Sequence, residues 1–449
     1  MRARSPRRHP LSPELVGFLL LGLSFVVIFL GFPVAFTLTF LSLAFGYAAL
    51  GDLVFYLSVF QINGLMQDDI MPAVPLFIFM GYLLEEGGLM ERLFQAFRLL
   101  LGPVPGALHV AVLLTATIFG IASGTVGATV AVAGIMAVPT LVRAGYDARL
   151  SAGAITAGGT LGILIPPSVM LVVMGPTMGV SVVDLYAAAC GPGFMLAGIF
   201  IVWAVIRCLI NPRLGPPLPA HQRAHSLRTL ALELSLGMLP HVILTVVTLG
   251  PILAGLATPS EGAGVGVVGT LIMTALYRTL TWARLKAAVI LTAQQSSMVF
   301  FLAIASNIFG AVFTRLGSAT LMTDALIGLP LPAMGTLLVV MLLIFVLGWP
   351  FEWPAIILVF VPLVQPAVMA LKFDPLWFAT LVAVNLQTAF LSPPVAMSAY
   401  YLKAVAPDWD LRDIYWGMAE FMVLQLIGLL VVMLFPGIGL WFPHWLYGK

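Results

Sequence analysis

The sequence predicts an all-α polytopic membrane protein made of two inverted repeats, with about eleven transmembrane spans. Of its 449 residues, 61% are hydrophobic and only 8% are charged, so the chain has too few charges to solvate the surface of a water-soluble globule. Apolar runs of spanning length, about 20 residues each, recur from Glu14 to the C-terminus. Matching turn residues in the two halves indicate the repeats.

The repeats are related by a constant spacing of 227 residues. From 128 to 168, eight of 41 positions are identical at this spacing, and four of the eight are turn formers. These matches are Pro139 with Pro366, Asp147 with Asp374, and Pro166-Pro167 with Pro393-Pro394. A polar, proline-rich stretch at 211–228 separates the first repeat, 1–228, from the second, 229–449. Lys and Arg on alternate loops favour a cytoplasmic central stretch and opposite topology for the two repeats, although the basic first ten residues do not fit this orientation.

Each repeat is expected to contain a re-entrant hairpin, over about 108–142 and about 333–371. Residues 108–121 are apolar but cover only about 21 Å as a helix, less than the roughly 30 Å hydrocarbon layer. A break at Ser123-Gly124 follows, and the second hairpin has its tip in GWPFEWP at 348–354. Two short arms around such a break are typical of a hairpin whose tip is sheltered at membrane depth.

A broken helix is expected after each hairpin, over about 150–178 and about 375–403. Each Pro-Pro pair removes two backbone donors and clashes with the preceding turn, which leaves carbonyl groups without partners. These carbonyl oxygens, together with nearby hydroxyl groups, can bind a hard cation, and the N-termini of the half-helices can bind an anionic substrate. The alternative is that Gly and Pro act here only as kinks and packing contacts, as they often do in membrane helices.

We therefore expect two Na⁺ sites and a substrate pocket. The expected residues of the first cation site are Ser123, Gly124, Thr125, Gly159, Thr160 and Pro166. Those of the second cation site are Gly348, Glu352, Asn385, Gln387, Thr388 and Ser392. Those of the substrate pocket are Thr125, Trp349, Trp353, Pro167 and Pro394. For Trp349 and Trp353, packing against a scaffold is an equal alternative.

Several stretches resemble the large membrane subunit of the tripartite ATP-independent periplasmic (TRAP) transporters. They are GTLGILIPPSVMLVVMG, ASGTVGATVAVAG, VPTLVRAGYD, NLQTAFLSPPVAM, GFPVAF, MPAVPLFIFMGYLLEEGG and ATPSEGAGVG. The similarity covers nearly the whole chain. It implies an elevator-type fold, in which a transport domain that contains both hairpins and both broken helices moves against a scaffold.

The family's site residues match this chain unevenly. Ser123, Gly124, Gly159, Thr160, Gly162, Pro166 and Pro167 fit its pattern, whereas Thr125 and Gly127 stand where further serines are usual. At the second tip the family commonly has Asp-Pro, and this chain has Glu352-Trp353-Pro354. The longer acid and the indole rings are expected to alter the pocket, so the substrate need not be a C4-dicarboxylate.

The resemblance also implies the function, partners and location. We expect Na⁺-coupled uptake of a carboxylate solute by a multi-pass permease of the bacterial inner membrane. The expected partners are a periplasmic binding protein, a separate small four-helix membrane subunit and membrane lipid. We expect no nucleic-acid partner, no catalytic residues, no cofactor and no metal beyond Na⁺.

Three other functions remain open from the residues alone. The first is a stand-alone Na⁺- or H⁺-coupled anion symporter without a binding protein, for which Glu352 is the titratable candidate at a tip. The second is an intramembrane enzyme that uses Asp68, Asp69, Glu85 and Glu86. The third is a channel. Hairpin tips that meet broken helices disfavour it, because they form an occluded site and not a continuous pore.

Overall fold

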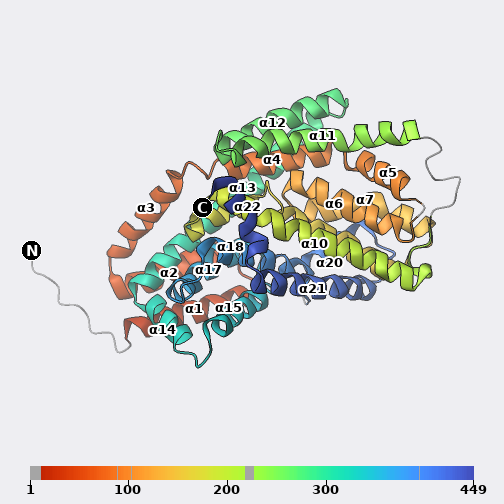
Figure 1. The fold of residues 1–449 in the computed structure, drawn as a ribbon. Helices are drawn as coiled ribbons and strands as arrows, with labels where there is room; N and C mark the ends of the chain where they lie inside the picture. The colour runs from red at the N-terminus through yellow and green to blue at the C-terminus, as the bar shows by residue number, and fades with distance from the viewer. Residues whose placement is uncertain (1–11, 88, 103, 218–226, 394, 449) are drawn as a thin grey trace, which may run out of the picture. The chain divides into compact units, whose positions relative to one another are not determined.

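The computed structural model describes residues 12–448 except 88, 103, 218–226 and 394. Within these ranges every regular element is a helix (Figure 1), as the sequence predicts. The described chain falls into two compact units. Unit 1 comprises the described part of Met1–Asp68 together with Ser297–Leu342 and Pro354–Phe373, and unit 2 comprises the described parts of Asp69–Ser296, Leu343–Trp353 and Asp374–Lys449.

Six described helices are long and apolar enough to cross a membrane, or seven if a pair bent by 63° counts as one span. The six are Val126–Arg143, Val182–Ile210, Ala231–Leu253, Trp282–Arg315, Trp353–Ala370 and Leu411–Leu434. Seven further apolar helices have 10–17 residues. The all-helical, multi-pass membrane fold is thus confirmed, while the count of about eleven spans and the depth of the hairpin tips stay predictions.

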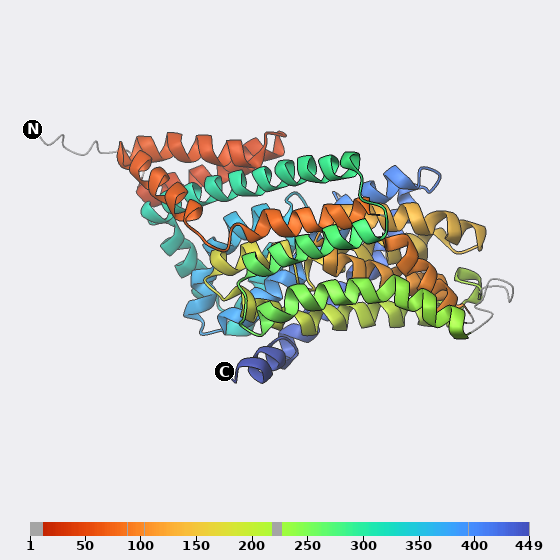
Figure 2. The ribbon, with the colours of Figure 1, turned by 90° about the horizontal axis from the view of Figure 1, so that it is seen from above.

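Unit 1 is built around the N-terminal helices, drawn in red and orange in Figure 2. Its elements are α1 (Pro13–Phe29), α2 (Val34–Leu50), α3 (Leu53–Met66), most of α13 (Trp282–Arg315), α14 (Ser318–Ile327), the first part of α15 (Ala333–Leu347), the end of α16 (Trp353–Ala355), the π-helix η4 (Ile356–Phe360) and α17 (Val361–Ala370). Ser12 caps α1, and the Phe18 and Phe313 rings pack edge to face at 5.9 Å.

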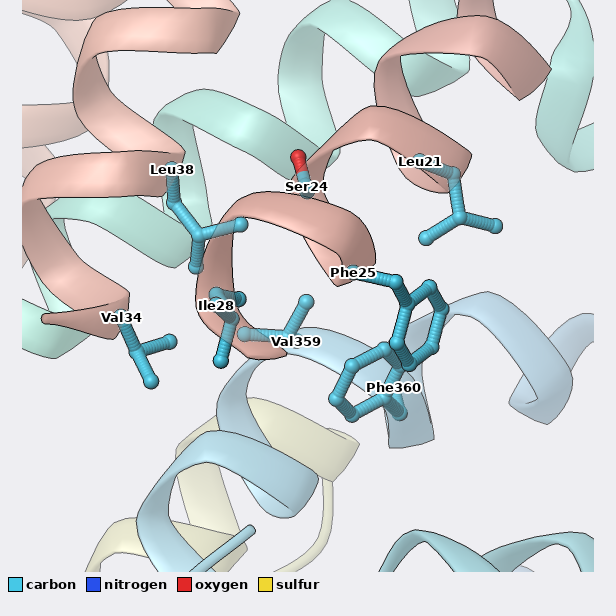
Figure 3. A pocket seen from close by; sticks show the side chains of 8 residues that line it. All are labelled: Leu21, Ser24, Phe25, Ile28, Val34, Leu38, Val359 and Phe360. Carbon is cyan, nitrogen blue, oxygen red and sulfur yellow. The ribbon is translucent and has the colours of Figure 1, made fainter. Parts of the chain in front are cut away.

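A small apolar pocket lies between α1, α2 and η4 in unit 1 (Figure 3). Its lining residues are Leu21, Ser24, Phe25, Ile28, Val34, Leu38, Val359 and Phe360. The rings of Phe25 and Phe360 stack across it with centroids 5.3 Å apart. Its free volume of about 10 Å³ is the size of a single water molecule, so this pocket has no room for a solute.

Unit 2 contains the first hairpin and both broken helices. The first part of α13, the end of α15 and the start of α16 also belong to unit 2. Its other elements are α4 (Ala73–Glu86), α5 (Leu89–Leu101), α6 (Ala107–Ser123), α7 (Val126–Arg143), α8 (Ala148–Thr160), η1 (Leu161–Ile163), α9 (Val169–Met178), α10 (Val182–Ile210), η2 (Pro212–Leu214), α11 (Leu227–Leu253), α12 (Pro259–Leu276), α18 (Pro375–Leu386), α19 (Thr388–Leu391), α20 (Met397–Val405), α21 (Leu411–Leu434) and α22 (Gly437–Tyr447). The α8 helix packs against α6, α7 and α21, and α18 packs against α10 and α21.

Both helices that follow the hairpins are interrupted at their proline pairs. The first runs as α8 and η1 and resumes as α9, with residues 164–168 outside regular helix. The second runs as α18 and α19 and resumes as α20. Asp147 and Asp374, which the 227-residue spacing relates, both cap their helices by accepting a backbone N–H three residues on, at 2.8 and 2.7 Å. Equivalent positions in the two halves therefore have the same structural role.

Candidate cation and substrate sites

The first hairpin tip is formed by the end of α6 and the start of α7. Gly124 has φ +64°, a left-handed conformation that closes α6 and that residues with a Cβ rarely adopt. Thr125 then begins α7 in an extended conformation. The Ser123 and Thr129 hydroxyl groups lie 2.9 Å apart, and Thr129 donates to the Thr125 carbonyl at 2.6 Å. The tip is thus a compact turn rich in oxygen atoms.

This tip and its arm meet the first broken helix. A Cβ added to Gly162 would lie 2.6 Å from the Gly120 Cα. The two backbones are therefore too close for either residue to have a side chain. A Cβ on Gly124 would lie 3.8 Å from the Pro167 carbonyl oxygen. A Cβ on Gly159 would lie 2.3 Å from a methyl group of Val130 in α7. Glycines therefore bring the tip, the arm and the break together.

The break itself is fully buried. The Pro166–Pro167 peptide bond is cis. Beyond it the Ser168 hydroxyl donates to the Ile163 carbonyl, and the Tyr186 hydroxyl donates to the Ser168 carbonyl at 3.3 Å. These bonds connect the two sides of the interruption and keep its polar groups inside unit 2.

The second tip approaches the second broken helix in a similar way. A Cβ on Gly348 would lie 3.0 Å from the Cβ of Ala389 in α19. Around Ala389, the Thr388 hydroxyl donates to the Asn385 carbonyl at 2.6 Å and the Ser392 hydroxyl donates to the Thr388 carbonyl at 2.7 Å. Four of the six expected ligands of the second cation site, Asn385, Gln387, Thr388 and Ser392, are therefore buried along one stretch of chain, with Gly348 beside it.

The acid and the two indoles of the second tip have different surroundings. The Glu352 side chain is exposed. The Trp353 side chain is 9% exposed, while that of Trp349 is 39% exposed and packs edge to face on Phe345 with centroids 5.9 Å apart. No contact of these residues with Pro167 is recorded among the described residues, and Pro394 lies outside them. Their place in a substrate pocket stays a prediction.

A buried polar network connects the two broken helices. The Gln387 Oε1 lies 2.7 Å from Gln425 Nε2 in α21 and 3.4 Å from the Thr160 hydroxyl. All three side chains have no exposed surface. Thr160 and Gln387 are related by the 227-residue spacing, so equivalent positions of the two halves are in contact.

Three features of this region were not predicted from the sequence. Gln425 gave only a weak signal, as a single amide in the apolar helix α21. A Cβ on Gly81 of α4 would lie 2.2 Å from the Ser123 carbonyl oxygen, and one on Gly127 would lie 3.0 Å from the Tyr401 ring. Helices outside the hairpin thus also reach the first tip.

A buried polar cluster closes the base of the first hairpin. His109 Nε2 lies 2.9 Å from the Ser151 hydroxyl, and Cys208 Sγ lies 3.5 Å from His109 Nδ1. The Tyr146 ring packs edge to face on His109 at 4.8 Å, and its hydroxyl accepts the backbone N–H of Leu108 at 3.3 Å. Burial raises the pKa of Tyr146 to about 12, so this phenol stays neutral and serves as a packing anchor.

The acidic residues considered for an enzyme do not form one cluster. Asp69 precedes α4 and Glu85 lies near its end, so the 14-residue helix places them about 20 Å apart. Among the described residues, no group of three or more His, Cys, Asp or Glu side chains is placed to hold a metal ion. Asp69 and Glu85 therefore lie near opposite ends of α4 and not in one cluster.

A second, charged recess of about 570 Å³ lies beside α10 and α21. Arg149 pairs with Asp413 at 2.7 Å, and Arg207 pairs with Glu420 at 2.9 Å. The Trp203 indole also donates to Glu420, at 3.2 Å. Because its Arg residues are already paired, this recess is better suited to holding α8, α10 and α21 together than to binding an anion.

Comparison with known proteins identifies the family. The family described as "Tripartite ATP-independent periplasmic transporter, DctM component" matches residues 21–438. The chain belongs to this family. It is therefore a transport component, specifically a large TRAP permease subunit, and a multi-pass protein of the bacterial inner membrane.

Curated relatives agree over most of their length. The chain is 29% identical to the C4-dicarboxylate TRAP transporter large permease protein DctM of Pseudomonas aeruginosa, over 83% of this chain and 86% of that one. It is 27% identical to the sialic acid TRAP transporter large permease protein SiaM of Vibrio cholerae, over 94% and 97%. It is 28% identical to the isethionate TRAP transporter permease protein DctMQ of Oleidesulfovibrio alaskensis, over 96% of this chain and 66% of that one.

A solved structure shares the fold. The Alcanivorax borkumensis YdaH transporter superposes with a TM-score of 0.62, over 95% of this chain and 98% of that one, at 16% sequence identity. The all-helical transporter fold predicted from the sequence is thus confirmed.

Proposed function

We propose that this permease subunit takes up an organic acid together with Na⁺. The observation that carries the proposal is the contact of each hairpin tip with its own broken helix, through Gly124 and Pro167 in one half and Gly348 and Ala389 in the other. Apart from the Glu352 carboxyl group, the polar groups that we assign to the two sites are neutral, and their oxygens suit a hard cation such as Na⁺. Two such sites, one in each half, would couple uptake to the Na⁺ gradient.

The oxygens of the first Na⁺ site would come from the tip and the break. We assign them to Ser123, Gly124, Thr125, Gly159, Thr160 and Pro166. Those of the second site we assign to Gly348, Glu352, Asn385, Gln387, Thr388 and Ser392. In both sets the helix termini and hydroxyl groups hold the oxygens in place before an ion arrives, which reduces the cost of ordering them on binding.

The substrate would bind beside the tips as a carboxylate. Relatives are named for C4-dicarboxylate, sialic acid and isethionate, all of which are acids. The N-terminus of α7 begins at Thr125, next to the first tip, and favours a negative charge through its free N–H groups. We place Thr125, Trp349, Trp353, Pro167 and Pro394 around the solute. The tip residues Glu352 and Trp353 argue for an acid other than a simple C4-dicarboxylate.

The partners would be those of a tripartite system. We propose that a periplasmic binding protein delivers the solute and that a small membrane subunit accompanies this chain, as the family description indicates. Uptake of the radiolabelled solute into proteoliposomes tests this assembly. The full-length chain and its small subunit should take up solute only with an inward Na⁺ gradient and the loaded binding protein outside. Equal uptake with K⁺ in place of Na⁺, or without the binding protein, would contradict the proposal.

A further inference from the structure

The polar network between the broken helices contains an amide pair that is closed to solvent. Gln387 and Gln425 have no exposed surface, and a single hydrogen bond of 2.7 Å joins them. Gln387 Nε2 and Gln425 Oε1 have no partner among the residues that the structure describes. Buried polar groups are costly when unpaired, and such groups mark places where a ligand or water completes the bonding.

The Thr160 hydroxyl adds a constraint. The hydroxyl has one proton and two possible acceptors, the Ala157 carbonyl at 2.8 Å and Gln387 Oε1 at 3.4 Å. With the proton on the shorter bond, the Thr160 oxygen can interact with Gln387 only by accepting a hydrogen bond. The Gln387 oxygen cannot donate that bond, whereas its amide nitrogen can.

A half-turn of both amides about their last C–C bonds exchanges each oxygen with its nitrogen. The Gln387 amide then donates one N–H to Gln425 Oε1 and the other to Thr160 Oγ1. Both N–H groups of Gln387 then have acceptors. The Gln387 oxygen takes the place where its Nε2 had no partner, and the Gln425 nitrogen takes the place where its Oε1 had none. That oxygen then lies one residue before Thr388, at the start of the second group of proposed ligands.

We propose that Gln425 and Thr160 are positioning residues that occupy both N–H groups of Gln387 and thereby hold its carbonyl oxygen bare for the second Na⁺. The inference rests on the proposed function, because it assigns a role within the proposed second site. It also connects that site to the first, since Thr160 belongs to the first broken helix. The two proposed sites thus share one hydrogen-bond network.

The effect on ion affinity follows from the freedom that Gln387 would gain. A glutamine side chain released from both bonds samples several rotamers, and only the fraction with its oxygen in place binds the ion. Loss of one bond should therefore raise the Na⁺ concentration for half-saturation about threefold to tenfold.

The test measures Na⁺-dependent thermal stabilisation of the purified full-length chain, with choline replacing Na⁺. Gln425→Met keeps the length but removes the acceptor, so it should raise the half-saturating Na⁺ concentration about threefold to tenfold. Gln425→Glu keeps an acceptor oxygen and should stay within about twofold of the parent. Leu429→Met, a buried apolar change one turn along α21, is the matched control and should not shift it.

Each outcome decides between roles. If Gln425→Met lowers the melting temperature in choline but leaves the half-saturating Na⁺ concentration within about twofold, Gln425 is only structural and the inference fails. If Gln425→Glu weakens Na⁺ as much as Gln425→Met does, the residue acts as a donor and the inference also fails. If Gln425→Met does not fold, Gln425→Asn, which withdraws the acceptor by one methylene group, must show the same rise, and an unchanged half-saturating Na⁺ concentration overturns the inference. A parent chain that Na⁺ does not stabilise would overturn the proposed function itself, and this inference with it.

Discussion

The contact between Gly120 and Gly162 allows a quantitative prediction for Gly162→Ala. The added Cβ would lie 2.6 Å from the Gly120 Cα and 2.7 Å from its carbonyl oxygen. Carbon atoms in contact prefer about 3.5–4.0 Å, so the hairpin arm and the broken helix must separate by roughly 1 Å. Overpacking of this kind costs about 1–3 kcal/mol, and no flexible side chain is there to absorb it.

Gly162→Ala should therefore lower the free energy of unfolding by about 1–3 kcal/mol and raise the half-saturating Na⁺ concentration at least about fivefold, if a similar energy is lost from ion binding. Thermal unfolding and Na⁺-dependent uptake in proteoliposomes measure the two effects. The matched control is Gly198→Ala in α10, where a Cβ meets nothing within 4 Å and alanine should stabilise the helix by about 0.5–1 kcal/mol. Parent-level stability and uptake in Gly162→Ala would refute the idea that close backbone contact holds the first site together.

Three further predictions concern single side chains. Asp147→Ala and Asp374→Ala should each cost about 0.5–2 kcal/mol in thermal unfolding, because each removes a helix cap, and a cost for only one of the two would argue against equivalent roles. Arg149→Ala should cost less than about 1 kcal/mol, since its pair with Asp413 is partly exposed, and a larger loss would mean that the charged recess matters more than the geometry indicates. Glu352→Gln should leave Na⁺-driven uptake largely intact, whereas uptake that becomes driven by a proton gradient alone, or loses its Na⁺ dependence, would count against Na⁺ coupling.

Local sequence signals predicted the interruptions and the caps well. Pro166-Pro167 cannot continue a helix whatever surrounds it, because the missing donors and the ring clash are properties of the residues themselves. Asp147 and Asp374 are similarly typical helix caps, and the structure has helices beginning directly after both. These features depend on a few neighbouring residues, which the sequence displays directly.

Features that depend on packing between distant segments were not predictable. The approach of Gly120 to Gly162 requires the exact rotation of α6 against η1, and both residues are ordinary glycines in a chain that has 43 of them. Gln425 faces Gln387 only because α21 packs against α18, α19 and α8. A single amide in an apolar helix predicts a buried polar contact but does not name its partner.

The tip of the second hairpin shows a third kind of limit. Trp349 and Trp353 are four positions apart and chemically identical, and yet Trp349 is partly exposed while Trp353 is nearly buried. The short turn between α15 and α16 sets their directions, and residues in such turns have no fixed periodicity from which a face could be read. The sequence pattern therefore predicted that both residues lie at the tip, but it did not predict which of them is exposed.

Direct measurement of ²²Na⁺ binding to the purified full-length chain tests the central claim most directly. The account predicts two saturable sites per chain, with occupancy reduced to one by Ser123→Ala or by Ser392→Ala and abolished by the double variant. Binding that does not saturate, or that these two serine substitutions leave unchanged, would contradict it.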